Sequence, residues 1–183
     1  MSSDPSKLDV LKGLKLQYIG NVLDMLTLGF GPLKRRISKV GPYKGQQQTV
    51  AKFRLHIQCP WRLDGPKTTI TGRYDYFIYS GPGKEPKKWK NWDYNDFENS
   101  LLNKRLTTFL GNPPFWRTDW KHEKGSLIVA AVSETIFGDL KIRFTPKYTL
   151  RVFPHSTAGE SWRFFEHDEH DVSPHYVFPP EKD

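Results

Sequence analysis

The sequence carries its most regular pattern between residues 53 and 63, which read Phe53-Arg54-Leu55-His56-Ile57-Gln58-Cys59-Pro60-Trp61-Arg62-Leu63. Apolar and polar residues alternate here, as they do along a strand that buries one face. We therefore predict that the odd-numbered residues from Phe53 to Cys59 face a core, and that the even-numbered ones from Arg54 to Gln58 face the opposite side. Pro60 has no backbone N–H to donate to a neighbouring strand, so the strand is expected to end there.

The same segment concentrates side chains that are able to bind or to react, and we call them the signature cluster: His56, Gln58, Cys59, Trp61 and Arg62. A thiolate beside an imidazole forms a nucleophile and base pair, but residues three apart on a strand point to opposite faces. Buried cysteine and tryptophan are also common in structural cores. The cluster is compatible with an enzyme of unknown type centred on His56, Cys59 and Arg62, and a structural role is the favoured interpretation.

Residues 55–62 resemble the segment LHxQCPWR of a family of small bacterial cytoplasmic proteins. Two further stretches are similar to that family in the same order along the chain: residues 24–31, and residues 150–156 followed by 160–165, which fit VFPxS…ExWRxF. The resemblance implies a single compact β-rich domain of the kind found beside toxin, immunity or phage-defence genes. It brings no established catalytic residues. The basic stretches 34–44 and 84–90 depart from it, and a specific partner would be recognised there.

Length and composition favour one domain. A chain of 183 residues is long enough for one substantial core, so residues 1–183 are treated as a single domain. No apolar run reaches the roughly eighteen residues that span a membrane, and the N-terminus lacks the basic and then apolar pattern of a secretory signal. The single cysteine cannot form an internal disulfide. These features predict a cytoplasmic protein with no membrane contact.

Charge is unevenly distributed along the chain. The formal net charge is +8, but residues 151–183 hold three basic and seven acidic residues, which leaves +12 on the first 150 residues. A basic body with an acidic tail indicates either an anionic partner or partial neutralisation of the body by the tail. Residues 166–183 form an acidic C-terminal segment that contains histidines, and imidazoles with carboxylates are metal ligands. Its stretch His167-Asp168-Glu169-His170-Asp171 is interpreted as a solvated loop between two strands, so we predict neither a metal site nor a cofactor.

The order of the predicted elements indicates an α+β fold. Gly20-Asn21 between two apolar runs is a hairpin signal, and residues 34–44 are interpreted as a basic loop. One helix is expected, capped by Asn95 or Asp96 and continuing to Leu110. Strands are expected at residues 47–59, 68–79, 126–135, 139–144, 148–153, 161–165 and 175–178. We therefore predict a mainly antiparallel curved sheet or half-barrel packed on one principal helix.

Two basic segments interleave cations with tryptophans. One lies within residues 80–95, whose Pro, Gly and Lys content predicts a surface loop, and the other follows the helix. Their candidate partner-binding residues are Lys87, Lys88, Trp89, Lys90, Trp92, Arg117, Trp120 and Lys121. The mixture suits protein docking, because Trp and Arg dominate interface hot spots, and it also suits single-stranded nucleic acid. Burial of the tryptophans in the core is the structural alternative.

These observations lead to one preferred function and two alternatives. We predict a non-enzymatic protein-binding component of a bacterial conflict system, either immunity-like or a phage-defence accessory protein. Its expected partner is another protein with an acidic surface. The alternatives are a nucleic-acid-binding module that uses the basic body and the enzyme centred on the signature cluster. No catalytic residue is assigned.

Overall fold

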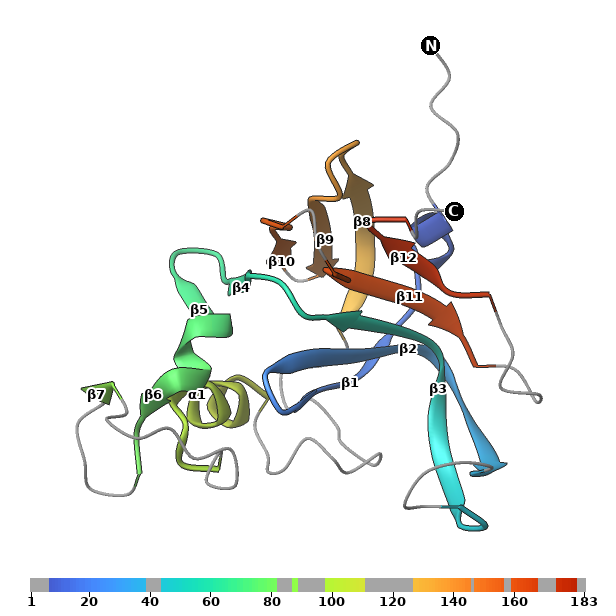
Figure 1. The fold of residues 1–183 in the computed structure, drawn as a ribbon, viewed down its shortest axis with the longest axis horizontal. Coiled ribbons are helices and arrows are strands. Elements are labelled where there is room, and N and C mark those ends of the chain that lie inside the picture. Colours follow the sequence, from blue (N-terminus) through green and yellow to red (C-terminus); the bar gives the residue numbers. More distant parts are fainter. Residues whose placement is uncertain are drawn as a thin grey trace.

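The structure is a computed structural model that describes residues 7–38, 44–81, 87–88, 98–110, 127–145, 147–156, 159–167 and 174–180. Within these residues the strands form two five-stranded antiparallel sheets and one pair of two-residue strands (Figure 1). One α-helix, α1 (Leu101–Leu110), lies beside them. The predicted α+β class with mainly antiparallel strands is therefore confirmed, but the half-barrel is not formed, because neither sheet is closed or strongly curled.

The first sheet has the strand order β1-β2-β3-β11-β12. Its strands are β1 (Leu16–Val22), β2 (Met25–Ile37), β3 (Gln47–Ile57), β11 (Trp162–Glu166) and β12 (Tyr176–Phe178). The second sheet has the order β5-β4-β10-β9-β8. Its strands are β4 (Trp61–Asp64), β5 (Thr69–Gly72), β8 (Ile128–Glu134), β9 (Leu140–Thr145) and β10 (Tyr148–Val152). The short pair is β6 (Ile78–Tyr79) with β7 (Lys87–Lys88).

Residues 58–60 carry the chain from the first sheet into the second. The backbone N–H groups of Gln58 and Cys59 donate to the carbonyl oxygen of Ser161 over 2.8 and 3.2 Å. The carbonyl oxygen of Pro60 accepts a hydrogen bond of 2.8 Å from the backbone N–H of Phe153. The predicted break at Pro60 is confirmed, and it forms a corner that is fixed to both sheets.

The buried side chains of the two sheets and of α1 belong to one hydrophobic core. Its fully or nearly fully buried members include Leu28, Leu55, Trp162, Leu63, Ile142, Leu150 and Leu106. The sheets also meet where β1 begins, since Leu16 N–H donates to the Leu127 carbonyl oxygen over 2.8 Å. One shared core explains how segments far apart in the sequence fix the position of the corner at residues 58–60.

The helix begins later than the sequence predicts. The hydroxyl oxygen of Ser100 accepts a hydrogen bond of 3.1 Å from the backbone N–H of Asn103, so Ser100 is the N-cap. The predicted caps Asn95 and Asp96 lie outside the described residues. The predicted apolar stripe is confirmed by the burial of both Leu101 and Leu106. Among the described residues no helix is long and apolar enough to cross a membrane.

Three local predictions are wrong. Gly20-Asn21 lies inside β1, and the hairpin turns instead at Leu23 and Asp24, where Leu23 has φ 53°. The predicted strand 68–79 is interrupted by a 3₁₀ helix at Arg73–Phe77. Residues 34–37 continue β2 rather than form a loop. The other predicted strands are confirmed to within two residues, apart from the part of 126–135 that lies outside the described residues.

Candidate functional site

The alternation predicted for the signature cluster is present. Phe53, Leu55, Ile57 and Cys59 are all buried, whereas His56 is half-buried and Gln58 is exposed. His56 therefore lies on the outer face of the first sheet, and Cys59 lies in the core. The structure does not bring the imidazole and the thiol together.

The environment of Cys59 favours an inert thiol. Burial raises the pKa of Cys59 to about 11, and backbone hydrogen bonds and the charge of Arg73 act in the opposite direction. A thiol with such a pKa is protonated at neutral pH, and the thiolate is the reactive species. Trp61 is also buried in the core, at 4% exposure. These two members of the signature cluster act as core residues.

His56 belongs to a polar and aromatic group on the outer face, which we call the outer cluster: His56, Gln58, Glu160, Arg163, Phe165 and His175. The His56 ring meets the edge of Phe165 at 5.0 Å, and His175 stacks on Phe165 at 4.5 Å between ring centroids. Glu160 accepts hydrogen bonds from Gln58 at 2.9 Å and from Arg163 Nε at 2.7 Å. The cluster is thus a connected network that joins β3, β11 and the residues beside β12.

Burial, followed by the positive charges of Arg54 and Arg163, lowers the pKa of His56 to about 4, although Glu160 acts in the opposite direction. His56 is consequently neutral at neutral pH, and its Nε2 atom is shielded from solvent without a hydrogen-bond partner in the described part of the chain. A neutral imidazole in this position packs against Phe165. It is not poised to exchange protons near neutral pH.

Acid should therefore destabilise the protein through His56. An unfolded histidine titrates near pH 6.5, whereas the folded one binds its proton only near pH 4. Between these values the unfolded chain binds more protons, so the free energy of unfolding should fall as the pH falls. The expected loss is on the order of 1 to 2 kcal/mol, less than the full pKa difference implies because His56 is partly exposed. Urea unfolding at a series of pH values measures it.

The matched variants are His56→Gln and His155→Gln, of which the second removes an exposed histidine. His56→Gln should flatten the stability profile between pH 6.5 and 4, and His155→Gln should keep the wild-type slope. An unchanged slope in His56→Gln would show that His56 does not titrate as described.

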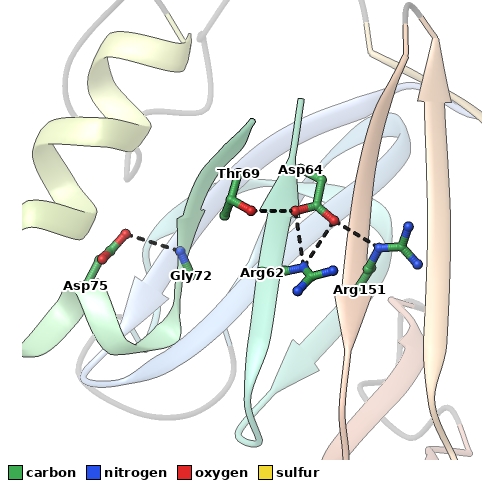
Figure 2. Close-up of polar contacts among 6 residues, drawn as sticks. All are labelled: Arg62, Asp64, Thr69, Gly72, Asp75 and Arg151. Carbon is green, nitrogen blue, oxygen red and sulfur yellow. Dashed lines mark hydrogen bonds and ion pairs between the residues drawn. The ribbon is translucent and has the colours of Figure 1, made fainter. Parts of the chain in front are cut away.

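Arg62, the last member of the signature cluster, is part of an ion network on the second sheet. Figure 2 shows the carboxylate of Asp64 between Arg62, Thr69 and Arg151. Asp64 accepts hydrogen bonds from Arg151 Nε at 2.9 Å, from Thr69 Oγ1 at 2.9 Å and from Arg62 Nε at 3.1 Å. Partial burial acts to raise the pKa of Asp64, but the three hydrogen bonds together lower it. Asp64 thus ties β4 to β5 through Thr69 and to β10 through Arg151, and Arg62 of the same strand joins this network.

A second carboxylate in Figure 2 fixes the start of the 3₁₀ helix Arg73–Phe77. Asp75 accepts a hydrogen bond from the backbone N–H of Gly72 at 3.3 Å and one from Thr71 Oγ1 at 2.7 Å. It also pairs with Arg105 of α1 at 2.7 Å. This contact joins α1 to the 3₁₀ helix, which directly follows β5 of the second sheet.

Most of the predicted partner-binding residues fall outside the described part of the chain. The backbone of Lys87 and Lys88 forms β7, which pairs with β6. The remaining six residues are not among those described: Trp89, Lys90, Trp92, Arg117, Trp120 and Lys121. The docking hypothesis for these residues stays a prediction.

The structure reveals instead a basic two-stranded arm. We call residues 32–38 and 44–50 the hairpin arm (Figure 1). In this arm β2 and β3 stay paired beyond Phe30, which is the last residue of β2 that pairs with β1. At its end Ser38 N–H donates to Gln46 at 2.9 Å and Gly45 N–H donates to Ser38 at 2.8 Å. Gly45 has φ +80°, a conformation that favours glycine. The described strands of the arm are thus regularly paired from Leu33 to Ile37.

The hairpin arm presents cations together with apolar side chains. Leu33, Arg35 and Ile37 share one face, because alternate residues of a strand point to the same side. Leu33 is 40% exposed and Ile37 65% exposed, and Arg35 between them is exposed as well. Within the described residues Lys34, Arg35 and Lys44 have no ion-pair partner.

A sequence signal for this surface exists. From Met25 to Leu63 the chain contains no Asp or Glu, although it contains eight Lys and Arg residues. That imbalance is visible without a structure, whereas the pairing of residues 34–37 with residues 47–50 is not. The composition of residues 34–44 predicts a basic loop, and residues 34–37 instead continue β2.

The chain matches no model of a protein family, and searches of curated proteins and of solved structures find no significant similarity. Among the described residues no group of three or more His, Cys, Asp and Glu side chains is placed to hold a metal ion.

Proposed function

We propose that this protein is a non-enzymatic binding protein that docks an acidic surface of another protein through the hairpin arm. Its setting would be a bacterial conflict system, in an immunity-like or phage-defence accessory role. That setting rests on the resemblance of residues 55–62 to the bacterial family. The docking rests on one observation, the line of Leu33, Arg35 and Ile37 exposed on an arm whose flanking sequence carries no carboxylate.

Charge and apolar exposure together favour a protein partner. Uncompensated cations attract an acidic surface and raise the rate of association. Arginine flanked by apolar side chains also has the composition of an interface centre, where desolvated anchors supply most of the binding energy. The phosphate backbone of a nucleic acid would bind the cations but would make no favourable contact with the apolar side chains of Leu33 and Ile37.

The chemistry of the signature cluster supports the non-enzymatic part of the proposal. Cys59 is a buried thiol of raised pKa, and His56 lies on the opposite face of the strand with a lowered pKa. Arg62 is engaged by Asp64 at 3.1 Å. The three residues on which the enzyme hypothesis depends therefore lie in separate environments, which supports a non-enzymatic protein.

A nucleic acid is the second candidate partner, favoured by the shape of the arm. The major groove of DNA admits a two-stranded β-ribbon, and Arg and Gln are the side chains that read guanine and adenine. Arg36 pairs with Gln48 across the arm, next to Ile37 and Gln47. Binding of this kind would weaken steeply with salt, with a log–log slope of about −0.9 per phosphate for duplex DNA and about −0.7 for single strands.

The two candidates are separated by photo-crosslinking from the arm. A photoreactive amino acid replaces the exposed Ile37 in one variant and, as a control, the exposed Ile136 of the β8–β9 turn in another. In native cells Ile37 should yield a crosslinked product that protease removes and nuclease does not, and that the Ile136 position does not give. A nuclease-sensitive product would support the nucleic-acid candidate. Equal products from both positions, or none from Ile37, would refute docking through the arm.

Charge reversal on the arm should weaken binding without affecting stability. Lys34→Glu with Arg35→Glu should lower the affinity for the crosslinked partner by at least about tenfold, or about 1.4 kcal/mol. Both side chains are exposed, so the melting temperature should change little. The affinity is measured by titration calorimetry.

The matched control reverses the same number of charges elsewhere. Lys141→Glu with Arg143→Glu alters two exposed residues of β9 and produces the same net charge. If both double variants lose affinity equally, net charge rather than the arm is responsible.

A further inference from the structure

The outer face of the second sheet carries a row of cations. Arg62 of β4 is the register partner of Arg151 in β10, and Arg151 is the register partner of Lys141 in β9. Residues directly opposite each other on antiparallel strands point to the same side of the sheet. Arg143 lies two residues beyond Lys141 on β9, so it shares this side. The residues that alternate with these cations are buried in the core, so the cations lie on the side away from it.

Two of these cations have no carboxylate to balance them. Arg62 and Arg151 share the carboxylate of Asp64, which accepts hydrogen bonds from them at 3.1 and 2.9 Å (Figure 2). Lys141 and Arg143 are exposed, and no ion pair joins either of them to another residue in the described part of the chain. Four cations and one carboxylate leave an excess of three positive charges on the outward side of β4, β9 and β10.

The remainder of this face is polar. Ser133 of β8 is the register partner of Lys141, whereas Glu134 lies opposite the buried Leu140 and so on the inner side. Within β4, β8, β9 and β10 no large aliphatic side chain is exposed. The centre of a protein interface needs apolar anchors, whereas the backbone of a nucleic acid needs only cations. The composition of this face, unlike that of the hairpin arm, therefore favours a nucleic acid.

An exposed aromatic ring lies at the end of the row. Phe153 directly follows β10, and its backbone N–H donates to the carbonyl oxygen of Pro60 over 2.8 Å. Its side chain is 39% exposed, and the guanidinium carbon of Arg62 lies 5.7 Å from the centroid of its ring. The bases of a single strand stack on aromatic rings and on arginine guanidinium planes. Phe153 with Arg62 supplies both kinds of surface beside the cations.

We propose that the outer face of the second sheet binds single-stranded nucleic acid. Lys141, Arg143 and the Arg62–Arg151 pair neutralise phosphates, and a base stacks on Phe153 beside Arg62. Neighbouring strands lie about 4.8 Å apart, so the row from β4 to β9 spans about 10 Å. Docking of a protein through the hairpin arm places no contact on this face, so the two proposals are independent.

The test is fluorescence anisotropy of a labelled oligodeoxythymidylate of about fifteen nucleotides, titrated with the full chain at several salt concentrations. At about 50 mM salt the binding should saturate with a Kd between about 1 and 100 µM. The log–log slope of affinity against salt should be about −2, because each neutralised phosphate of a single strand contributes about −0.7 and three positive charges are in excess. A duplex of the same length should bind more weakly, because its bases are not free to stack.

A matched pair of charge variants locates the binding face. Lys141→Gln with Arg143→Gln should weaken binding at least about tenfold and reduce the slope to about −0.7. Lys34→Gln with Arg35→Gln removes the same charge from two exposed residues of the hairpin arm and should keep the wild-type slope. Equal losses in both double variants would show that only net charge acts. A loss in the arm variant alone would assign the nucleic acid to the arm, and either result overturns the proposal.

The aromatic contact is tested separately. Phe153→Ala should weaken binding by about fivefold or more, as loss of one stacked base does. Phe137→Ala, which removes an exposed ring from the turn between β8 and β9, should bind like the wild type. Phe153→Leu keeps an apolar side chain beside Arg62, so it tests stacking even where the alanine variant is less stable. Wild-type binding by a folded Phe153→Leu, absence of saturation, or equally tight binding of the duplex would overturn the proposal.

Discussion

Replacing Trp162 by Ala should lower the free energy of unfolding by about 3 to 5 kcal/mol, which is the range for removal of a buried aromatic side chain. Trp162 is fully buried at the first residue of β11. Its ring stacks on Phe178 at 5.6 Å and meets the edge of Tyr176 at 5.4 Å between centroids. Urea unfolding followed by circular dichroism measures the loss, and an unchanged midpoint would contradict the placement of Trp162 in the core.

The polar part of this effect can be separated from the packing part. The indole N–H of Trp162 donates a hydrogen bond of 2.8 Å to the carbonyl oxygen of Gly138, in the turn between β8 and β9. Trp162→Phe keeps an aromatic ring but leaves that carbonyl without its donor, which costs about 1 to 3 kcal/mol for a buried group. Ile136→Ala changes the exposed tip of the same turn and should alter stability by no more than about 0.5 kcal/mol.

The strands could be predicted wherever one face is buried along their whole length. Residues 53–57 and 140–144 alternate cleanly, and both alternations appear as buried and exposed faces in the structure. The turn after β1 could not be predicted, because Gly20-Asn21 is the stronger local signal. Leu23 adopts φ 53°, a conformation that is rare for leucine, and Asp24 pairs with the distant Arg73. Tertiary contacts therefore decide the position of this turn.

Glycine and proline make the sequence before the hairpin arm predict a loop where the structure has a strand. Gly29, Gly31 and Pro32 read as breakers, yet all three lie within β2. Gly29 makes room for the ring of Tyr18, and Gly31 with Pro32 occupies the irregularity in register between Phe30 and Leu33. Each breaker thus serves a tertiary contact or a bulge. These contacts involve residues of other strands, so the local sequence around each glycine or proline does not reveal them.

In the candidate sites, too, the direction of a side chain follows from the local sequence, whereas its neighbours depend on tertiary contacts. The outward direction of Arg54 and His56 follows from the alternation of residues 53–59, so the sequence alone predicts it. The row of Arg62, Arg151 and Lys141 depends on the register of β4, β10 and β9, which no local pattern specifies. The excess of cations from Met25 to Leu63 is visible in the sequence. The pairing of β2 with β3 that exposes some of these cations on the hairpin arm is known only from the structure.

The second large effect is expected at Trp61, where replacement by Ala should also cost about 3 to 5 kcal/mol. Trp61 is the first residue of β4, immediately after the corner at residues 58–60, and it is 4% exposed in the core shared by both sheets. Loss of the ring leaves a cavity at the point where the chain passes between the sheets. Thermal and urea unfolding should both show the loss, and a melting temperature near the wild-type value would contradict this position of the corner.

A comparison of the two tryptophans tests the structure more sharply than either alone. The indole N–H of Trp61 has no hydrogen-bond partner in the described part of the chain, whereas that of Trp162 is bonded to Gly138. Trp61→Phe therefore leaves no acceptor unpaired, and the free energy of unfolding should fall only by the amount that the lost side-chain volume accounts for. Trp162→Phe loses a similar volume and also leaves a buried carbonyl unpaired, so it should be less stable than Trp61→Phe by roughly 1 to 3 kcal/mol. The reverse order would mean that the indole of Trp61, not that of Trp162, holds a buried hydrogen bond.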